Sequence, residues 1–215
     1  RAFAVDPAGP ARLPTLVGYL AGALVLRGQA RAARPLLERF DLLTSDVDMT
    51  SPAGQMVVLS ASWRGWLGDY EATDARLEQW IASGHASGAA GFLGFVLAFG
   101  CEMDLRLGRW ARARSRGEES LALLAETGQL GPSGYAASCL ASLEALLGLS
   151  EAARRRAGAV LEQAARLRIG SAETYARWAL GLDALARGDP EVAASDLAPL
   201  EEHVARHGLA EPAAV

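Results

Sequence analysis

Few residues in this sequence have the type and spacing that catalysis or metal binding requires. His203 and His207 stand four residues apart, which places two imidazoles on one face of a helix and can ligate a metal ion. Val204 stands where a zinc-protease motif has glutamate, however, and no third ligand is apparent. The stretch Gly131–Gly134 does not match the Gly-x-Ser-x-Gly nucleophile elbow. We therefore expect no enzyme, no catalytic residue, no metal site and no cofactor.

The charge pattern also argues against nucleotide, nucleic-acid and membrane binding. A phosphate-binding loop needs a lysine, whereas all 21 basic residues here are arginine. The net charge is −4, and the arginines of 109–116 and 154–156 have acidic neighbours, so we expect no direct contact with nucleic acid. The uncharged run 86–101 is too short to span a bilayer and predicts a buried helix instead.

The composition indicates a bacterial, cytoplasmic protein. Lysine and asparagine are absent and isoleucine occurs only at Ile81 and Ile169, as expected from a GC-rich genome. Two cysteines, Cys101 and Cys139, are too few for a disulfide framework and fit a reducing compartment. The chain opens with Arg1 and shows no signal-peptide pattern, so we expect a fragment of a larger protein.

The elements that position these residues follow an internal repeat. Similar short segments each hold a glycine, and these glycines recur at an interval of 40 residues, at Gly28, Gly68, Gly108, Gly148 and Gly188. Small residues stand seven positions before and five positions after each glycine, where two helices would approach closely. Glycine is the expected helix terminator between them, because it adopts the left-handed conformation at low cost.

The register predicts an all-α chain in which five helix pairs form a single domain over residues 1–215. The expected pairs are 14–27/31–43, 52–67/71–83, 91–107/111–126, 132–147/151–168 and 172–187/191–207. Linkers rich in helix breakers are expected at 44–52, 83–88, 128–134 and 170–171.

Both ends of the predicted array lack a polar cap. Residues 211–215 would begin a sixth unit, and residues 1–5 would end a preceding one. Stacked repeats need polar caps to stay soluble, so self-association through the uncapped ends is a further expectation.

The pattern of a small residue, six residues, glycine, four residues and alanine, with Gly-Asp-Tyr-Glu-Ala at 68–72, resembles the tetratricopeptide repeat. The ordinary repeat has 34 residues rather than 40. Residues 102–127 and 178–212 further resemble the helical region of large ATP-binding LuxR-type (maltotriose-activator-like) transcriptional regulators. The resemblance implies a right-handed α–α superhelix that senses a ligand or partner, between an ATPase module and a DNA-binding module that this chain lacks.

In stacked helix pairs the first helices line the concave face. Counting back 13, 10, 6 and 2 residues from each glycine predicts a groove that could hold a small-molecule inducer, a protein or a peptide. Its candidate binding residues are Gln55, Ser62, Trp66, Phe95, Glu102, Arg106, Tyr135, Ser138, Tyr175 and Trp178. The alternative for each aromatic residue is packing between neighbouring units.

Two hypotheses about function remain open. One is the regulatory sensor module of a transcription factor, and the other is a general protein-interaction scaffold unrelated to transcription. A groove that clamps a C-terminal carboxylate is disfavoured, because the resemblance would require lysine and asparagine, and Arg106 alone replaces them poorly.

Overall fold

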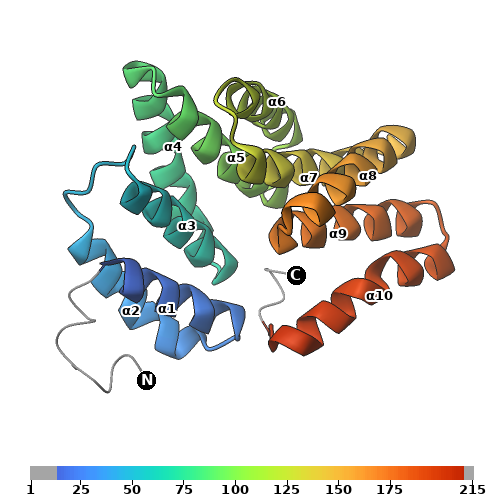
Figure 1. The fold of residues 1–215 in the computed structure, drawn as a ribbon, viewed down its shortest axis with the longest axis horizontal. Coiled ribbons are helices and arrows are strands. Elements are labelled where there is room, and N and C mark those ends of the chain that lie inside the picture. Colours follow the sequence, from blue (N-terminus) through green and yellow to red (C-terminus); the bar gives the residue numbers. More distant parts are fainter. Residues whose placement is uncertain (1–13, 211–215) are drawn as a thin grey trace. The chain divides into compact units, whose positions relative to one another are not determined.

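The computed structural model describes residues 14–210, and these residues form ten α-helices and no strand (Figure 1). The prediction of an all-α chain is confirmed. The helices are α1 (Pro14–Leu26), α2 (Ala30–Leu43), α3 (Pro52–Trp66), α4 (Tyr70–Ser87), α5 (Ala90–Arg106), α6 (Trp110–Glu126), α7 (Leu130–Leu146), α8 (Ser150–Leu167), α9 (Gly170–Ala186) and α10 (Pro190–His207). Residues 1–5 and 211–215, at which neighbouring units were expected, lie outside the described residues.

The repeated glycines end the first helix of each pair, as predicted. Gly108 has a φ of 70°, and its N–H donates to the carbonyl of Leu105 at 3.2 Å. The N–H of Arg109 donates to the carbonyl of Asp104 at 2.8 Å, which completes a Schellman motif. Gly28, Gly68, Gly148 and Gly188 have positive φ as well.

The same turn also joins one pair to the next, so three of the expected linkers are wrong. α4 continues to Ser87, α7 begins at Leu130 and α9 begins at Gly170. Gly88, Gly128 and Gly208 have positive φ, and Arg168 has a φ of 56°. A Schellman turn needs about three residues, and Pro132 fits in the first turn of α7, where its missing N–H costs nothing. Only 44–51 is a longer connection, as expected.

The small residues on both sides of each turn are buried. Their exposed fraction is at most 3% wherever it is measured, over Ala21, Ala61, Cys101 and Ala141 before the glycines and Ala33, Thr73, Ala113, Ala153 and Ala193 after them. Gly181 is also buried, and a Cβ placed there would lie 2.6 Å from Leu197. These columns therefore mark where paired helices approach most closely.

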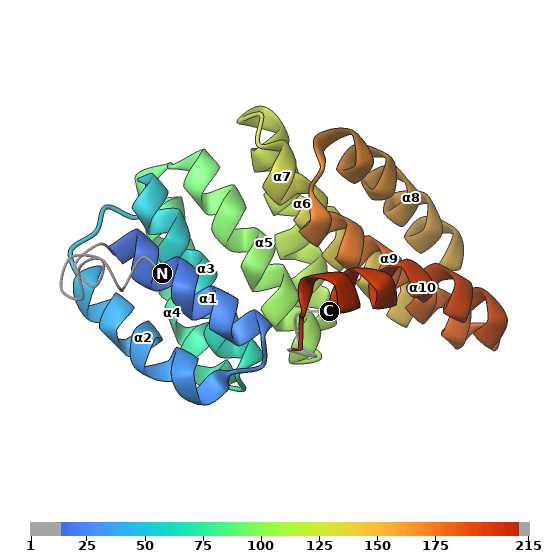
Figure 2. The ribbon, with the colours of Figure 1, turned by 60° about the horizontal axis from the view of Figure 1, so that its bottom comes forward.

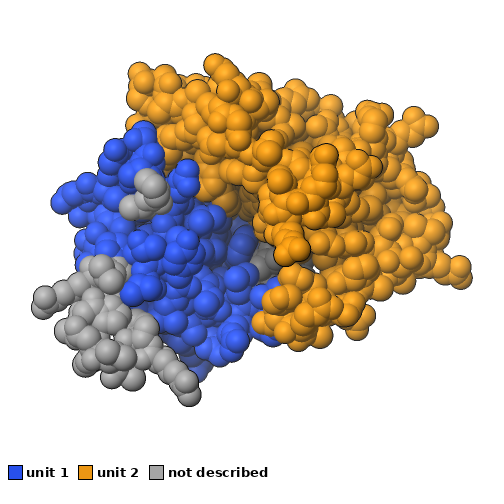
Figure 3. Space-filling model, in the orientation of Figure 1, with its two compact units in different colours: residues 1–76, 208–214 blue, residues 77–207, 215 orange. Residues whose placement is uncertain are grey.

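The chain divides into two compact units, residues 1–76 with 208–214 (unit 1) and residues 77–207 with 215 (unit 2) (Figure 3). In unit 1, α1 contacts α2 and α3. In unit 2, each hairpin packs internally, α5 contacts α7, and α7 contacts α9 (Figure 2). The second helices α6 and α8 also contact the first helices that follow them, α7 and α9.

Candidate functional site

A hydrogen-bonded cluster in unit 2 joins three successive first helices. Glu102 of α5 is 4% exposed, and its carboxylate accepts a hydrogen bond from the hydroxyl of Tyr135 in α7. It also accepts one from the hydroxyl of Tyr175 in α9, at 2.9 Å. Arg106, one turn further along α5, donates to the same carboxylate through Nε at 2.9 Å and Nη2 at 2.7 Å. We call these four residues the Glu102 cluster.

The electrostatics of the Glu102 cluster keep its donors protonated. Burial raises the pKa of Tyr135 well above its ordinary value, and the negative charge of Glu102 raises it further. Burial and Glu102 likewise raise the pKa of Tyr175, against an opposing effect of Arg106. Burial lowers the pKa of Arg106, but the Glu102 carboxylate raises it by more, so the guanidinium stays charged. Both phenols therefore act as neutral donors to a carboxylate that Arg106 neutralises.

A row of aromatic rings runs along the same helices. Phe95, Tyr135 and Tyr175 stand at the same register position, 13 residues before their glycines. Phe95 and Phe99 have ring centroids 5.1 Å apart, Phe99 and Tyr135 lie 5.0 Å apart, and Tyr135 and Tyr175 lie 5.0 Å apart. Each ring is 8% or 9% exposed. The structure thus brings together Phe95, Glu102, Arg106, Tyr135 and Tyr175 from the predicted set.

The other predicted groove residues of unit 2 lie in different surroundings. Ser138 is fully buried, and its hydroxyl lies 2.9 Å from the carbonyl of Gly134 and 3.2 Å from that of Ala172 in the next first helix. Trp178 is 37% exposed. Both residues stand ten positions before a glycine, so one register position is internal in α7 and open in α9.

Unit 1 holds the remaining three predicted residues, all in α3. Gln55 is exposed, and Trp66 is partly buried. Ser62 is 3% exposed, and its hydroxyl has no hydrogen-bond partner. Burial at Ser62, Glu102 and Ser138 favours the alternative of packing between neighbouring hairpins for these positions.

Buried ion pairs were missed at the sequence level, although the register contains their signal. Asp104 is fully buried and accepts hydrogen bonds from Arg112 (as short as 2.6 Å) and Arg116 (2.9 Å). Glu144 pairs with Arg156 at 2.7 Å. In both hairpins the acid stands four residues before the glycine and the arginine eight residues after it. Arg112, Arg116 and Arg156 therefore serve internal pairing rather than a basic surface.

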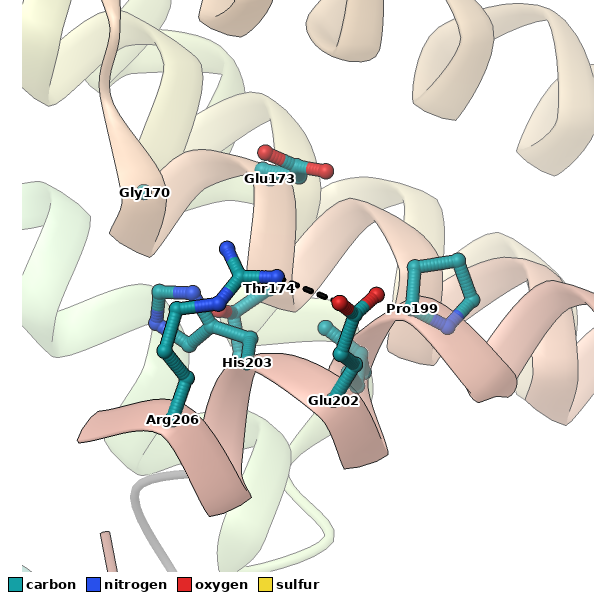
Figure 4. Close-up of a pocket in the computed structure, with 8 residues that line it drawn as sticks. Gly170, Glu173, Thr174, Pro199, Glu202, His203 and Arg206 are labelled. Atoms are coloured by element: carbon teal, nitrogen blue, oxygen red, sulfur yellow. Dashed lines mark hydrogen bonds and ion pairs between the residues drawn. The ribbon is translucent and has the colours of Figure 1, made fainter. Parts of the chain in front are cut away.

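A small polar pocket lies between the start of α9 and the end of α10 (Figure 4). Its volume is about 180 Å³, and Arg206 in its wall bonds Glu202 at 2.5 Å. His203 also lines the pocket, and its ring lies 4.3 Å from that of His207. Among residues 14–210, no group of three or more His, Cys, Asp or Glu side chains is placed to hold a metal ion.

The two cysteines are free thiols, and both are fully buried, as expected. A hydrogen bond with Cys101 raises the pKa of the Cys139 thiol, and burial adds to this increase. A buried thiol with a raised pKa is a poor nucleophile. Cys101 and Cys139 are therefore packing residues of α5 and α7.

None of the ten described helices combines the length and apolar character needed to cross a membrane. Comparison with known proteins finds no family model, no curated protein and no solved structure that matches the chain.

Proposed function

We propose that this chain is a non-catalytic binding domain of the tetratricopeptide class, with its hairpins coiled into a right-handed superhelix. The first helices line a groove that receives a small molecule or a protein. In this proposal the domain is the cytoplasmic sensor module of a bacterial LuxR-type transcriptional regulator.

The Glu102 cluster is the observation that carries the proposal. One carboxylate is bonded to hydroxyl groups 33 and 73 residues away, so α5, α7 and α9 are tied together at one point. Donors and acceptor satisfy one another there, which makes the surface rigid before any ligand arrives. A rigid surface loses less conformational entropy on binding.

The register also supplies open positions beside the cluster. Leu146 of α7 stands two residues before Gly148, as Arg106 stands two residues before Gly108, and Leu146 is 40% exposed. Leu149, on the other side of the turn, is 44% exposed and lies outside the predicted groove positions. The two leucines therefore form a matched pair for mutagenesis.

A thermal-shift screen with bacterial metabolites tests ligand binding. A groove ligand at about 100 times its Kd should stabilise the domain by about 2.7 kcal/mol. Leu146→Arg should abolish the shift, whereas Leu149→Arg should leave it unchanged. A ligand that shifts both variants equally would place the binding site elsewhere and contradict the groove.

The second candidate is a protein-interaction scaffold without a role in transcription. Exposed apolar side chains favour it, since Trp178 (37% exposed) and Leu185 (54% exposed) are two helical turns apart on one face of α9. The encoding gene separates the two candidates. A phosphate-binding loop before this region and a helix-turn-helix after it support the sensor, and a gene without them favours the scaffold.

A further inference from the structure

The face of α1 that carries Leu16, Tyr19 and Ala23 is apolar and open. Leu16 is 40% exposed, Tyr19 is 61% exposed, and Ala23 is exposed as well. α1 contains no charged residue, although one side of it faces solvent. Such a patch on a helix is typical of an interaction surface.

The repeat register shows what normally covers this face. Leu16, Tyr19 and Ala23 stand 12, 9 and 5 residues before Gly28. The residues at these positions in the first helices of unit 2 are at most 8% exposed, namely Val96, Phe99 and Met103 of α5, Ala136, Cys139 and Leu143 of α7, and Ala176, Ala179 and Asp183 of α9. Only α1 leaves all three positions exposed.

These positions pack against the preceding hairpin. In unit 1, Met56 and Trp63 of α3 lie against Gly18 and Gly22 of α1. In unit 2, Ala176 and Ala179 of α9 share a core cluster with residues of α8, which are Ala157, Val160 and Ala164. The open face of α1 is therefore the receiving half of the stacking interface that recurs within the chain.

The donating half is open at α9. The residues ten and six positions before the glycine are buried in α1, α3, α5 and α7, as Gly18/Gly22, Val58/Ser62, Ala98/Glu102 and Ser138/Ser142. In α9 they are Trp178, which is 37% exposed, and Leu182, which is partly buried.

The adjoining helix α10 is open in the same way. Gly117 and Leu124 of α6 and Ala157 and Ala164 of α8 are buried, whereas their equivalents Leu197 and Val204 of α10 are only partly buried. The hairpin α9–α10 thus presents apolar side chains at the positions that earlier hairpins use for stacking.

We propose that the α9–α10 hairpin of one copy of this chain docks on the α1 face of a second copy, head to tail. Trp178 and Leu182 of one copy meet Leu16 and Tyr19 of the next, as α7 meets α9 within the chain. The two faces differ, so the interface is heterologous and extends a chain of copies instead of closing a twofold dimer. This inference does not depend on a groove ligand.

Analytical ultracentrifugation with two surface variants tests the proposal. Tyr19→Arg disables the receiving face, and Trp178→Arg disables the donating face. The wild type should form a concentration-dependent series of oligomers, and each variant alone should weaken self-association by roughly tenfold or more. An equimolar mixture of the two variants should form a 1:1 heterodimer and grow no further, because each retains one working face.

Leu42→Arg is the control, since Leu42 of unit 1 is 75% exposed and lies outside both faces. It should assemble as the wild type does, and circular dichroism should show that all three variants are folded. A wild type that stays monomeric at its solubility limit overturns the proposal. So does continued assembly of Trp178→Arg alone, or a loss of assembly in Leu42→Arg.

Discussion

Tyr175 donates a hydrogen bond of 2.9 Å to Glu102, a residue 73 positions earlier in the chain. The bond connects the first helix of one hairpin with the first helix two hairpins before it, and Tyr135 of the intervening hairpin donates to the same carboxylate. A buried carboxylate that loses its partners has a large desolvation cost, so this point should control the stability of unit 2.

A double-mutant cycle measures the coupling between Glu102 and Tyr175. Tyr175→Phe removes one donor to a charged acceptor and should cost about 1.5–3 kcal/mol. Glu102→Gln leaves Arg106 without its counter-charge and should cost about 2–4 kcal/mol. The double variant should be less destabilised than the sum by about 1–2 kcal/mol, measured by urea unfolding. Strict additivity would show that the bond contributes nothing.

The raised pKa values of Tyr135 and Tyr175 predict a loss of stability in alkali. Above pH 10.0, the ordinary pKa of tyrosine, the unfolded chain releases phenolic protons that the folded chain retains. The unfolded state then binds fewer protons, so the free energy of unfolding falls by up to about 1.4 kcal/mol per pH unit for each tyrosine. Unfolding titrations between pH 8 and 12 should show this slope, and Tyr135→Phe/Tyr175→Phe should flatten it. An unchanged slope in the double variant would contradict the assignment.

Close packing beside the turns can be tested at Ala141. This residue is fully buried, and tryptophan there should overpack α7 against its neighbours and cost about 1–3 kcal/mol or more. Ala194 of α10 is exposed, and Ala194→Trp should change the free energy of unfolding by less than about 0.5 kcal/mol. Thermal melts of the two variants compare them directly, and equal melting temperatures would argue against the register.

Two turns should respond to substitution in opposite directions. Gly148 has a φ of 72° with open space around it, so Gly148→Ala should cost about 1 kcal/mol through backbone strain alone. Arg168 occupies the same conformation with a φ of 56°, and Arg168→Gly should stabilise the chain by about 0.5–1 kcal/mol. Denaturant midpoints read both signs, and a stabilising Gly148→Ala would refute the argument from strain.

The sequence alone determined the helices, the glycine turns and the small residues that pack beside them. These features depend on interactions over one or two helical turns, and the 40-residue interval displays them five times. It did not reveal that the hairpin connections repeat the same turn, because Arg168 replaces glycine in one of them and Pro132 suggested a linker.

Tertiary structure alone decided the partners of the polar side chains. Sequence spacing placed Glu102, Tyr135 and Tyr175 on first helices, but whether a carboxylate meets hydroxyl groups 33 and 73 residues away depends on the distance and rotation between stacked helices. The same holds for Trp178 and Ser138, which share a register position. One is exposed and the other buried because burial depends on which helix packs against the position, and no local pattern records that neighbour.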